Sequence, residues 1–409
     1  MGDAEIVYDE LLSAMGRGMQ PNAIRKLTAL LGRRDIISLA AGAPASETFP
    51  VEELAEIAAR VIRSRGQFAL QYGPTRGPQS LLEAIAEMLA GRGIIAKPAE
   101  IVVTSGSQQG LDLVARLLID PGDVAMVELP SYIGGIIALH NAQAEMVGVD
   151  QDDGGLVIED LREKITALRH SGRRVKCIYT IPNFQNPSGV TLAGERREQL
   201  VRIADEFDLL IVEDDPYFDL AFGETSRPPA LAALRPERVI YLGSFSKVLA
   251  PGLRAAYLRA PAAIAAKVEM AKEGADLSTS VLDQAMVLEA LRSGLIEKRL
   301  PELRQFYEVR CRAMLDALDE HAPAGSRWTR PTGGFFILLE MAAGMDATAA
   351  LPQAIDCGVA YVPGQPFFVD GGGANTLRLA YSKETPAQIS EGIARLGRVL
   401  AGTQRAEAV

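Results

Sequence analysis

Short apolar segments alternate with amphipathic segments through the middle of the chain, and this alternation limits the fold more than any other feature. The strand-like runs are residues 100–104, 123–128, 175–181, 209–213 and 238–242. The runs with helical spacing are residues 80–90, 108–118 and 195–207. Buried strands that alternate with helices predict an α/β fold, in which a mainly parallel sheet is covered by helices on both faces.

The pattern changes after residue 281, where a long helical stretch runs to about residue 320. We expect Pro301 to interrupt it, and we expect short strands at 335–339 and 376–380 before a last helix at 386–400. This order is typical of a smaller α+β domain, and 409 residues suit two domains better than one. The predicted parts are an N-terminal segment that packs with the small domain (1–50), a large domain (51–285) and a small C-terminal domain (286–409).

Charge and composition argue against several classes of function. The formal net charge is −10, whereas a protein that binds a nucleic-acid backbone needs a basic face. No uncharged apolar run approaches the ~20 residues that span a bilayer, and the acidic N-terminus does not resemble a secretory signal. Cys177, Cys311 and Cys357 lie far apart, as do the three histidines, so we expect neither a metal site nor a Ser-His-Asp triad. Separate free thiols favour a reducing, cytoplasmic location.

A lysine follows the predicted strand at 238–242 and stands beside hydroxyl groups. The motif SFSK contains Ser244, Ser246 and Lys247, and Arg254 follows in PGLR. An aldehyde cofactor needs a primary amine that is partly neutral, while hydroxyls and a guanidinium hold a phosphate through charge-assisted hydrogen bonds. The simpler interpretation is a polar turn with an exposed lysine. We favour a cofactor site because further motifs that suit the same cofactor follow other predicted strands.

Three acidic residues, Glu213, Asp214 and Asp215, stand at the end of the predicted strand at 209–213. A carboxylate beside the ring nitrogen of pyridoxal phosphate keeps that nitrogen protonated, so that the ring withdraws electrons. Asp214 suits this role, and Tyr217 stands three residues later, where its hydroxyl could donate to the phenolate oxygen of the ring. A solvated acidic turn is the alternative.

Two further turns carry weaker signals. TSGSQQG, at 104–110, connects a predicted strand to a helix, and free backbone N–H groups at such a helix start bind phosphate. PNFQNPSG, at 182–189, offers asparagine amides to an oxygen of the cofactor or substrate, with proline and glycine fixing the turn. Either motif taken alone would be an ordinary turn.

Arg378 lies inside the apolar run TLRLA of the second domain. A buried guanidinium demands an anionic partner, and its two parallel N–H groups match a carboxylate. The α-carboxylate of an amino-acid substrate would meet this demand. An internal salt bridge is the structural alternative.

Together these motifs resemble those of the fold-type I pyridoxal-phosphate aminotransferases, in particular the 2-aminoadipate, kynurenine and lysine aminotransferase group, which includes the catalytic part of MocR-type regulators. The resemblance covers nearly the whole chain, and its markers stand in the family's order. They are ISLAAGAP, QYGPTRG, TSGSQQG, PNFQNPSG, VEDDPY, SFSKVLAPGLR, YVPGQPFF and LRLAYS. The resemblance implies an aspartate aminotransferase-like fold with a seven-stranded type of sheet, and pyridoxal 5'-phosphate as the cofactor.

The resemblance also implies roles for single residues at the cofactor. Lys247 is expected to hold the cofactor as a Schiff base and to move the proton of the α-carbon. Asp214 is expected to pair with the ring nitrogen, while Tyr217 and Asn186 contact the phenolate oxygen. Tyr132 is expected to stack on the ring. The residues expected around the phosphate are Ser107, Gln108, Ser244, Ser246 and Arg254.

Further implied roles concern the substrate and a second subunit. Arg378, Asn186 and the backbone at Gly42 are expected to hold the substrate α-carboxylate. Tyr72 is expected to reach the phosphate of the other subunit, which implies a homodimer with shared active sites. Arg25 matches the arginine of an S-x-I-R pattern that gates side-chain recognition, although an asparagine replaces the serine here.

The predicted reaction is a ping-pong transfer of an amino group between an L-amino acid and a 2-oxo acid, with 2-oxoglutarate as the expected acceptor. A pyridoxal-phosphate lyase or decarboxylase of the same fold is the alternative, because the sequence does not show which bond of the α-carbon stands perpendicular to the ring. A transcription factor is disfavoured, since the family motifs begin near Arg25 and the chain is acidic. The identity of the substrate side chain stays open: Arg25 could pair with an acidic side chain or swing away for another.

Overall fold

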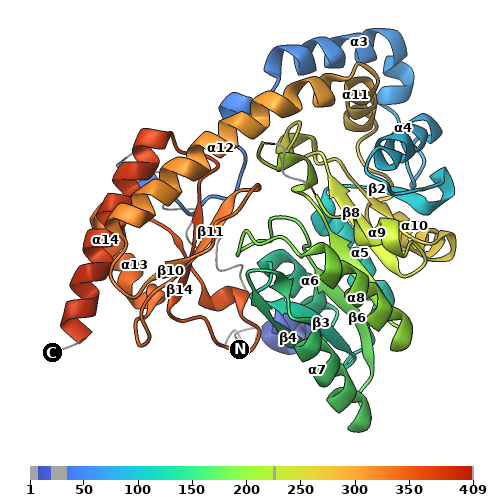
Figure 1. The fold of residues 1–409 in the computed structure, drawn as a ribbon. Helices are drawn as coiled ribbons and strands as arrows, with labels where there is room; N and C mark the ends of the chain where they lie inside the picture. Colours follow the sequence, from blue (N-terminus) through green and yellow to red (C-terminus); the bar gives the residue numbers. More distant parts are fainter. Residues whose placement is uncertain (1–7, 20–34, 224–226, 408–409) are drawn as a thin grey trace, which may run out of the picture.

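An eight-stranded sheet forms the centre of the larger part of the molecule (Figure 1). The computed structural model describes residues 8–19, 35–223 and 227–407. The strands of this sheet are β2 (Ile101–Thr104), β3 (Val124–Leu129), β4 (Glu145–Asp152), β5 (Gly155–Leu156), β6 (Val175–Thr180), β7 (Leu210–Asp214), β8 (Val239–Ser244) and β9 (Ala256–Arg259). Their order is β2-β9-β8-β7-β6-β3-β4-β5. β9 runs antiparallel to both neighbours and β5 antiparallel to β4, whereas the other pairs are parallel.

The central strands are buried along nearly their whole length. All residues of β2, and all but the last of β3 and β8, are buried. Since successive side chains of a strand point to opposite faces, both faces of the sheet must be covered. The helices of this part are α3 (Val51–Ala69), α4 (Gln79–Ala90), α5 (Ser107–Leu118), α6 (Ile133–Asn141), α7 (Ile158–His170), α8 (Gly194–Glu206), α9 (Leu231–Leu234) and α10 (Ala262–Asp276).

A smaller four-stranded antiparallel sheet lies in the C-terminal part. Its strands are β10 (Arg327–Trp328), β11 (Phe336–Glu340), β13 (Val362–Pro363) and β14 (Thr376–Ala380), in the order β10-β11-β14-β13. The helices after the large sheet are α11 (Val281–Arg292), α12 (Leu295–His321), α13 (Ala347–Asp356) and α14 (Pro386–Glu407). The two long helices α12 and α14 pack against each other along the outer side of this sheet (Figure 1).

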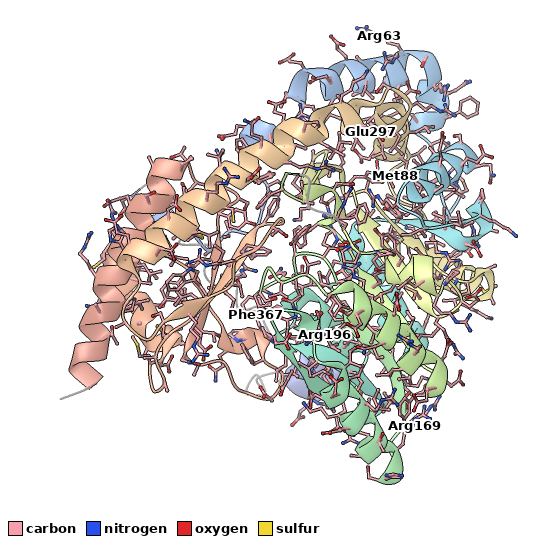
Figure 2. All side chains as sticks on the ribbon, viewed as in Figure 1. Arg63, Met88, Arg169, Arg196, Glu297 and Phe367 are labelled. Carbon is pink, nitrogen blue, oxygen red and sulfur yellow. The ribbon has the colours of Figure 1, made fainter. Side chains whose placement is uncertain are left out.

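The N-terminal segment and the loop before β14 join the two parts. β1 (Ile37–Ser38) pairs in parallel with β12 (Val359–Ala360), and α1 (Ala14–Gly18) precedes it. Phe367, labelled where the two parts meet in Figure 2, packs in a small apolar cluster with Ala40 and Ile133. The site described below lies along this seam.

The predicted strands and helices of the large sheet agree with the structure to within about two residues. The sheet has one strand more than the seven-stranded type, because the two-residue β5 forms a hairpin with β4. The predicted domain boundaries at 50 and 285 remain predictions; the second falls inside α11, which packs on α3 and α4. Among the described residues, no helix combines the length and the apolar character needed to cross a bilayer.

The predicted interruption at Pro301 is wrong. Pro301 lies inside α12, and the helical stretch breaks between α11 and α12 at Gly294, whose φ is +67°. Glycine adopts this left-handed conformation without steric cost, so the chain turns there. A proline removes one N–H from a helix, and here the helix continues because its buried face, which includes Leu303 and Tyr307, is held by packing.

Candidate active site

A cavity of about 440 Å³ opens at the carboxyl ends of the large-sheet strands, against the small domain. Large-domain residues on its wall include Ser107, Tyr132, Asn186, Asp214, Tyr217 and Lys247. The opposite wall is formed by Gly42, Phe336 and Arg378. The structure therefore brings most of the sequence-predicted site residues to one cavity.

The sheet topology explains why residues far apart in sequence meet here. β6, β7 and β8 are parallel neighbours, and β2 runs in the same direction because β9 lies antiparallel between β8 and β2. The carboxyl ends of all four strands therefore lie at one edge of the sheet. The segments that follow these strands carry, in chain order, Ser107, Asn186, Asp214 and Lys247.

Asp214, the last residue of β7, presents one carboxylate oxygen without a partner. Its Oδ2 accepts a hydrogen bond from the Tyr179 hydroxyl at 3.0 Å. Its Oδ1 is buried and has no hydrogen-bond partner among the described residues. Burial raises the pKa of Asp214 to about 7, against the lowering effects of the Tyr179 hydrogen bond and of Lys247. A protonated ring nitrogen at Oδ1 would fill the empty position and favour the ionised carboxylate.

Lys247 follows β8 and lines the cavity with its amine about 5.7 Å from the centroid of the Phe335 ring. Burial lowers its pKa to about 8; the charge of Asp214 opposes this effect, while Arg254 and Arg378 add to it. A substantial fraction of the amine is therefore neutral near neutral pH, as a nucleophile or a proton acceptor requires.

This lowered pKa predicts a pH dependence for the binding of the cofactor aldehyde by Lys247. When pyridoxal phosphate is mixed with cofactor-free protein, the rate of capture should rise by about tenfold per pH unit below pH 8 and level off above it, because only the neutral amine attacks. Stopped-flow absorbance from pH 6 to 10 measures this rate. Lysine with an acetylated α-amine, whose side-chain pKa is about 10.4, is the control and should show no plateau in that range. A rate on the protein that still rises steeply at pH 9.5 would contradict the shift.

Among the predicted phosphate ligands, Arg254 contacts the turn before α5, and Ser244 and Ser246 are hydrogen-bonded to each other. Ser246 N and Ser246 Oγ lie 3.1 and 2.9 Å from Ser244 Oγ, which fixes this pair of hydroxyls. Arg254 adopts a left-handed conformation with φ +47° and donates to the carbonyl of Ser105 at 3.3 Å. A Cβ on Gly106 would lie 2.1 Å from the Arg254 guanidinium, so glycine permits this close approach. Cationic and hydroxyl groups beside a helix start suit a phosphate dianion.

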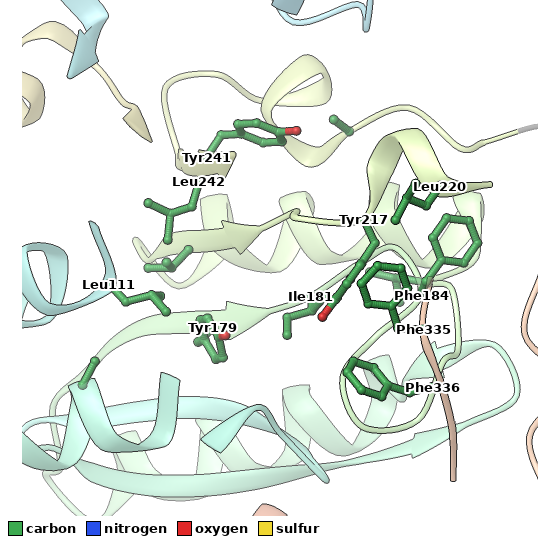
Figure 3. Close-up of a cluster of buried hydrophobic side chains, with 14 of the residues drawn as sticks. Leu111, Tyr179, Ile181, Phe184, Tyr217, Leu220, Tyr241, Leu242, Phe335 and Phe336 are labelled. Atoms are coloured by element: carbon green, nitrogen blue, oxygen red, sulfur yellow. The ribbon is translucent and has the colours of Figure 1, made fainter. Parts of the chain in front are cut away.

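Aromatic side chains form another wall of the cavity. Tyr217 meets Phe335 and Phe336 edge to face, with ring centroids 5.5 and 6.0 Å apart, as seen in Figure 3. Burial raises the pKa of Tyr217 and keeps its hydroxyl protonated, so that it remains a hydrogen-bond donor. Tyr132 caps α6 at the cavity wall, and burial raises its pKa too.

Arg378 from β14 is a buried cation without a carboxylate partner among the described residues. Its Nη1 donates to Asn186 Oδ1 at 3.0 Å and its Nη2 to the carbonyl of Ala40 at 2.9 Å, while its Nε has no partner in the same set. Burial lowers its pKa to about 10. A Cβ on Gly42 would lie 2.5 Å from the Phe336 ring, so only glycine fits beside this wall. An anion is the missing partner.

Among the described residues, the predicted site residues that do not line this cavity are Tyr72, Gln108, Ser244, Ser246 and Arg254. Tyr72 is 79% exposed and does not line the cavity of its own chain. Gln108 donates through Nε2 to the Gly134 carbonyl at 2.9 Å and so ties α5 to α6. Arg25 lies outside the described residues.

The sequence reasoning missed Tyr179, whose hydroxyl holds Asp214. Tyr179 lies inside the buried strand β6, where the sequence pattern gives no sign of a polar contact. It missed Phe336 as well, for the same reason: an aromatic residue in an apolar strand is usually core. A prediction of Tyr179 would have required the pairing of β6 with β7, which brings Tyr179 beside the strand that carries Asp214.

These residues fit pyridoxal phosphate. The amine of Lys247, the open Oδ1 of Asp214 and the basic start of α5 offer partners for an aldehyde, a ring nitrogen and a phosphate. Arg378 adds a position for a carboxylate on the opposite wall. The chemistry of this donor set is that of amino-acid transformation on a pyridine aldehyde.

Comparison with known proteins points the same way. Residues 34–396 match the family described as aminotransferase class I and II. The sequence is 41% identical over 394 residues to aromatic-amino-acid aminotransferase 1 of Thermococcus litoralis, across 96% of this chain and 94% of that protein. It is 43% identical over 396 residues to 2-aminoadipate transaminase of Thermus thermophilus, across 95% and 97%. The crystal structure of Pyrococcus horikoshii kynurenine aminotransferase in complex with PMP, KYN and KYA has a TM-score of 0.93 and 39% identity, covering 97% of this chain and 98% of that one.

Proposed function

The chain belongs to the class I and II aminotransferases, and from that premise we propose that it transfers the amino group of an L-amino acid to 2-oxoglutarate by a ping-pong mechanism. The predicted family, fold class and cofactor are confirmed: the protein is a pyridoxal-phosphate aminotransferase acting on amino acids. The observation that carries the proposal is the buried guanidinium of Arg378, which has no carboxylate partner among the described residues and faces the same cavity as the amine of Lys247.

Each proposed role follows from the position of a side chain. When bound, pyridoxal phosphate supplies a protonated pyridine ring that withdraws electrons from the substrate α-carbon. Asp214 Oδ1 accepts the ring N–H, and Tyr179 keeps that carboxylate oriented. Lys247 Nζ removes the proton from the α-carbon of the donor in the first half-reaction and supplies a proton to the α-carbon derived from the acceptor in the second, for which its lowered pKa suits it.

Other residues orient the substrate and shield it. Arg378 and Asn186 hold the α-carboxylate. Their side chains are hydrogen-bonded to each other at 3.0 Å and therefore lie close enough to contact the same group. Tyr217 donates to the phenolate oxygen of the ring, supported by its hydrogen bond with Asn186. Apolar side chains on the cavity wall, such as Ile133, Ile181 and Phe336, lower the local dielectric constant and so strengthen these charge interactions.

The alternative reaction, lyase or decarboxylase chemistry on the same fold, is not supported. The family and the named relatives are aminotransferases. A carboxylate that Arg378 held near the plane of the ring would keep its bond to the α-carbon out of the perpendicular position, which would favour loss of the proton over loss of carbon dioxide.

For the donor we propose a broad range that includes aromatic amino acids and 2-aminoadipate. Two relatives, 41% and 43% identical to this chain, are named as aminotransferases of these substrates. The test is a screen of the common amino acids with 2-oxoglutarate as acceptor, in which glutamate production is measured. Glutamate should appear with at least one aromatic or acidic donor. If donors convert the bound cofactor in single turnover but 2-oxoglutarate never restores it while another 2-oxo acid does, the proposed acceptor is wrong.

Replacement of Arg378 by lysine should lower kcat/KM for amino acids by about 10²- to 10³-fold, since a lysine cannot form the two parallel hydrogen bonds to a carboxylate. Steady-state kinetics with the best donor measures this loss. The control is the single-turnover rate with the decarboxylated amine of the same donor, which lacks the α-carboxylate and should change by less than about threefold. Equal losses with both compounds would show that Arg378 does not bind the carboxylate.

We further propose a homodimer in which Tyr72 reaches the phosphate of the other subunit. The support is an apolar patch at the end of α3, where Phe68, Leu70 and Tyr72 are 68%, 69% and 79% exposed. Water contact of this extent is unfavourable for neighbouring apolar side chains and marks an interaction surface. A measured solution mass equal to one 43.8 kDa chain would contradict the dimer.

We also propose a cytoplasmic location, which three free cysteines support.

A further inference from the structure

A partly buried ion pair at the end of α10 has no part in the reaction described above. The Lys272 side chain is 0% exposed, and its Nζ lies 2.5 Å from Oδ1 of Asp276, the last residue of the helix, whose side chain is 26% exposed. Burial of the Lys272 charge costs desolvation free energy that the attraction to Asp276 only partly offsets. A pair of this kind therefore calls for a structural or functional reason.

The other carboxylate oxygen of Asp276 holds the turn that precedes α5. Asp276 Oδ2 accepts from Ser105 Oγ at 2.8 Å and from Gln109 Nε2 at 2.7 Å. Gln109 Oε1 in turn accepts from Ser105 N at 2.8 Å, and Thr279 Oγ1 lies 3.2 Å from Ser105 Oγ. Ser105 is thus held at both its backbone amide and its hydroxyl.

Ser105 connects this anchor to the proposed phosphate cradle, by which we mean Ser107, Ser244, Ser246 and Arg254. The carbonyl of Ser105 accepts from Arg254 Nη2 at 3.3 Å. Gly106, the next residue, passes so close to the Arg254 guanidinium that a Cβ there would lie 2.1 Å away. The orientation of the Ser105 peptide therefore sets where Arg254 and the start of α5 lie.

We propose that Asp276 is a positioning residue for the phosphate cradle, and that Lys272 cancels its charge so that the anchor does not repel the cofactor phosphate. The inference rests on the proposed cradle. A neutral anchor would hold Ser105 less firmly than a carboxylate, because hydrogen bonds to an ionised acceptor are stronger. An uncompensated carboxylate behind Ser105 would repel a phosphate dianion at short range. The Lys272–Asp276 pair thus gives Ser105 a strong hydrogen-bond acceptor while its own net charge is zero.

The test measures how fast the holoenzyme of each variant loses pyridoxal phosphate during dialysis, from the absorbance of the bound cofactor. Asp276→Ala removes the acceptor and should release the cofactor about 10-fold faster, whereas Asp276→Asn keeps an acceptor oxygen and should change release by about 3-fold. Lys272→Met leaves the carboxylate uncompensated and should also accelerate release by about 10-fold or more. The double variant Lys272→Met/Asp276→Asn should retain the cofactor better than Lys272→Met alone.

A matched control pair exists on α7, where Lys164 and Asp160 have the same spacing along a helix and lie 2.7 Å apart, away from the cavity. Lys164→Met and Asp160→Asn should leave cofactor release unchanged. Thermal unfolding of each variant, followed by circular dichroism, shows whether it is folded at the temperature of dialysis, and release rates are compared among folded variants. If the effects of Lys272→Met and Asp276→Asn on release simply add, the charge-cancelling role is overturned.

Failure of the inference is distinguishable from failure of the cradle itself. Arg254→Gln should accelerate cofactor release if Arg254 binds the phosphate. If Arg254→Gln accelerates release while both Asp276 variants release at the normal rate, the cradle stands and the positioning role of Asp276 is wrong. If Arg254→Gln has no effect on release, the proposed cradle is wrong, and with it the inference.

Discussion

Replacement of Lys247 by alanine is expected to lower kcat by at least about 10⁴-fold while the fold is retained. Proton transfer by a positioned side chain contributes about 10²- to 10⁴-fold, and this variant also loses the nucleophile that binds the aldehyde. Among the described residues, Lys247 is the only lysine on the wall of the cavity, so no other lysine is placed to replace it. The small side chain leaves space and should not disturb the surrounding core.

The measurement is a single-turnover absorbance experiment with bound cofactor and a reactive donor, with steady-state kcat alongside. Lys267→Ala removes an exposed lysine of α10 and is the matched control, for which both rates should equal those of the unchanged protein. Added methylamine tests the chemical role, because a small free amine that restores part of the lost rate must replace a missing amine. A Lys247→Ala variant that retains even a tenth of the normal kcat would remove Lys247 from the mechanism.

The sequence predicts the large sheet well because its signals are local. The run 209–213 is apolar up to its last residue, Glu213, as suits a strand covered on both faces, and it ends where polar residues begin. Lys247 and Asp214 can be chosen for the same reason, since each follows such a run. Their meeting at one cavity follows from the shared direction of parallel strands.

What the sequence could not predict depends on contacts between distant segments. The break at Gly294 and the continuous helix through Pro301 depend on packing of α12 and not on proline content. That Arg378 contacts only neutral acceptors becomes clear only when β14, Asn186 and Ala40 are placed together. The role proposed for the exposed Tyr72 depends on a second chain, whose position a single sequence does not give.

The three acidic residues at the end of β7 show most clearly what the structure adds. Both oxygens of Glu213 accept backbone N–H groups, of Leu231 and Ala232, at the start of α9. Asp215 accepts from Asn183 at 3.0 Å and from Tyr241 at 3.2 Å. Asp214 alone of the three keeps a buried oxygen without a partner, and it alone lines the cavity. The sequence offers three carboxylates, and hydrogen bonding selects one.

Asp214→Asn is therefore expected to lower kcat/KM for the best donor by about 10³-fold. An amide carries no charge to keep the ring nitrogen protonated, and loss of one partner of a buried charged pair costs about 2–5 kcal/mol, which corresponds to about 30- to 5,000-fold. The variant is nearly the same size, so packing around β7 should persist. The ratio of single-turnover rates for the variant and the unchanged protein measures the loss.

Tyr179→Phe separates the charge of Asp214 from its orientation. It leaves the carboxylate but removes the hydrogen bond to Oδ2, so its loss in kcat/KM should stay near about 10-fold. The same removal should raise the pKa of Asp214, because that hydrogen bond favours the ionised form, and the low-pH limb of the kcat/KM profile should move to higher pH. The limb should be absent in Asp214→Asn, which has no carboxylate to titrate. An Asp214→Asn variant with the same limb and a loss below 10-fold would show that the ring nitrogen gains its proton without this residue.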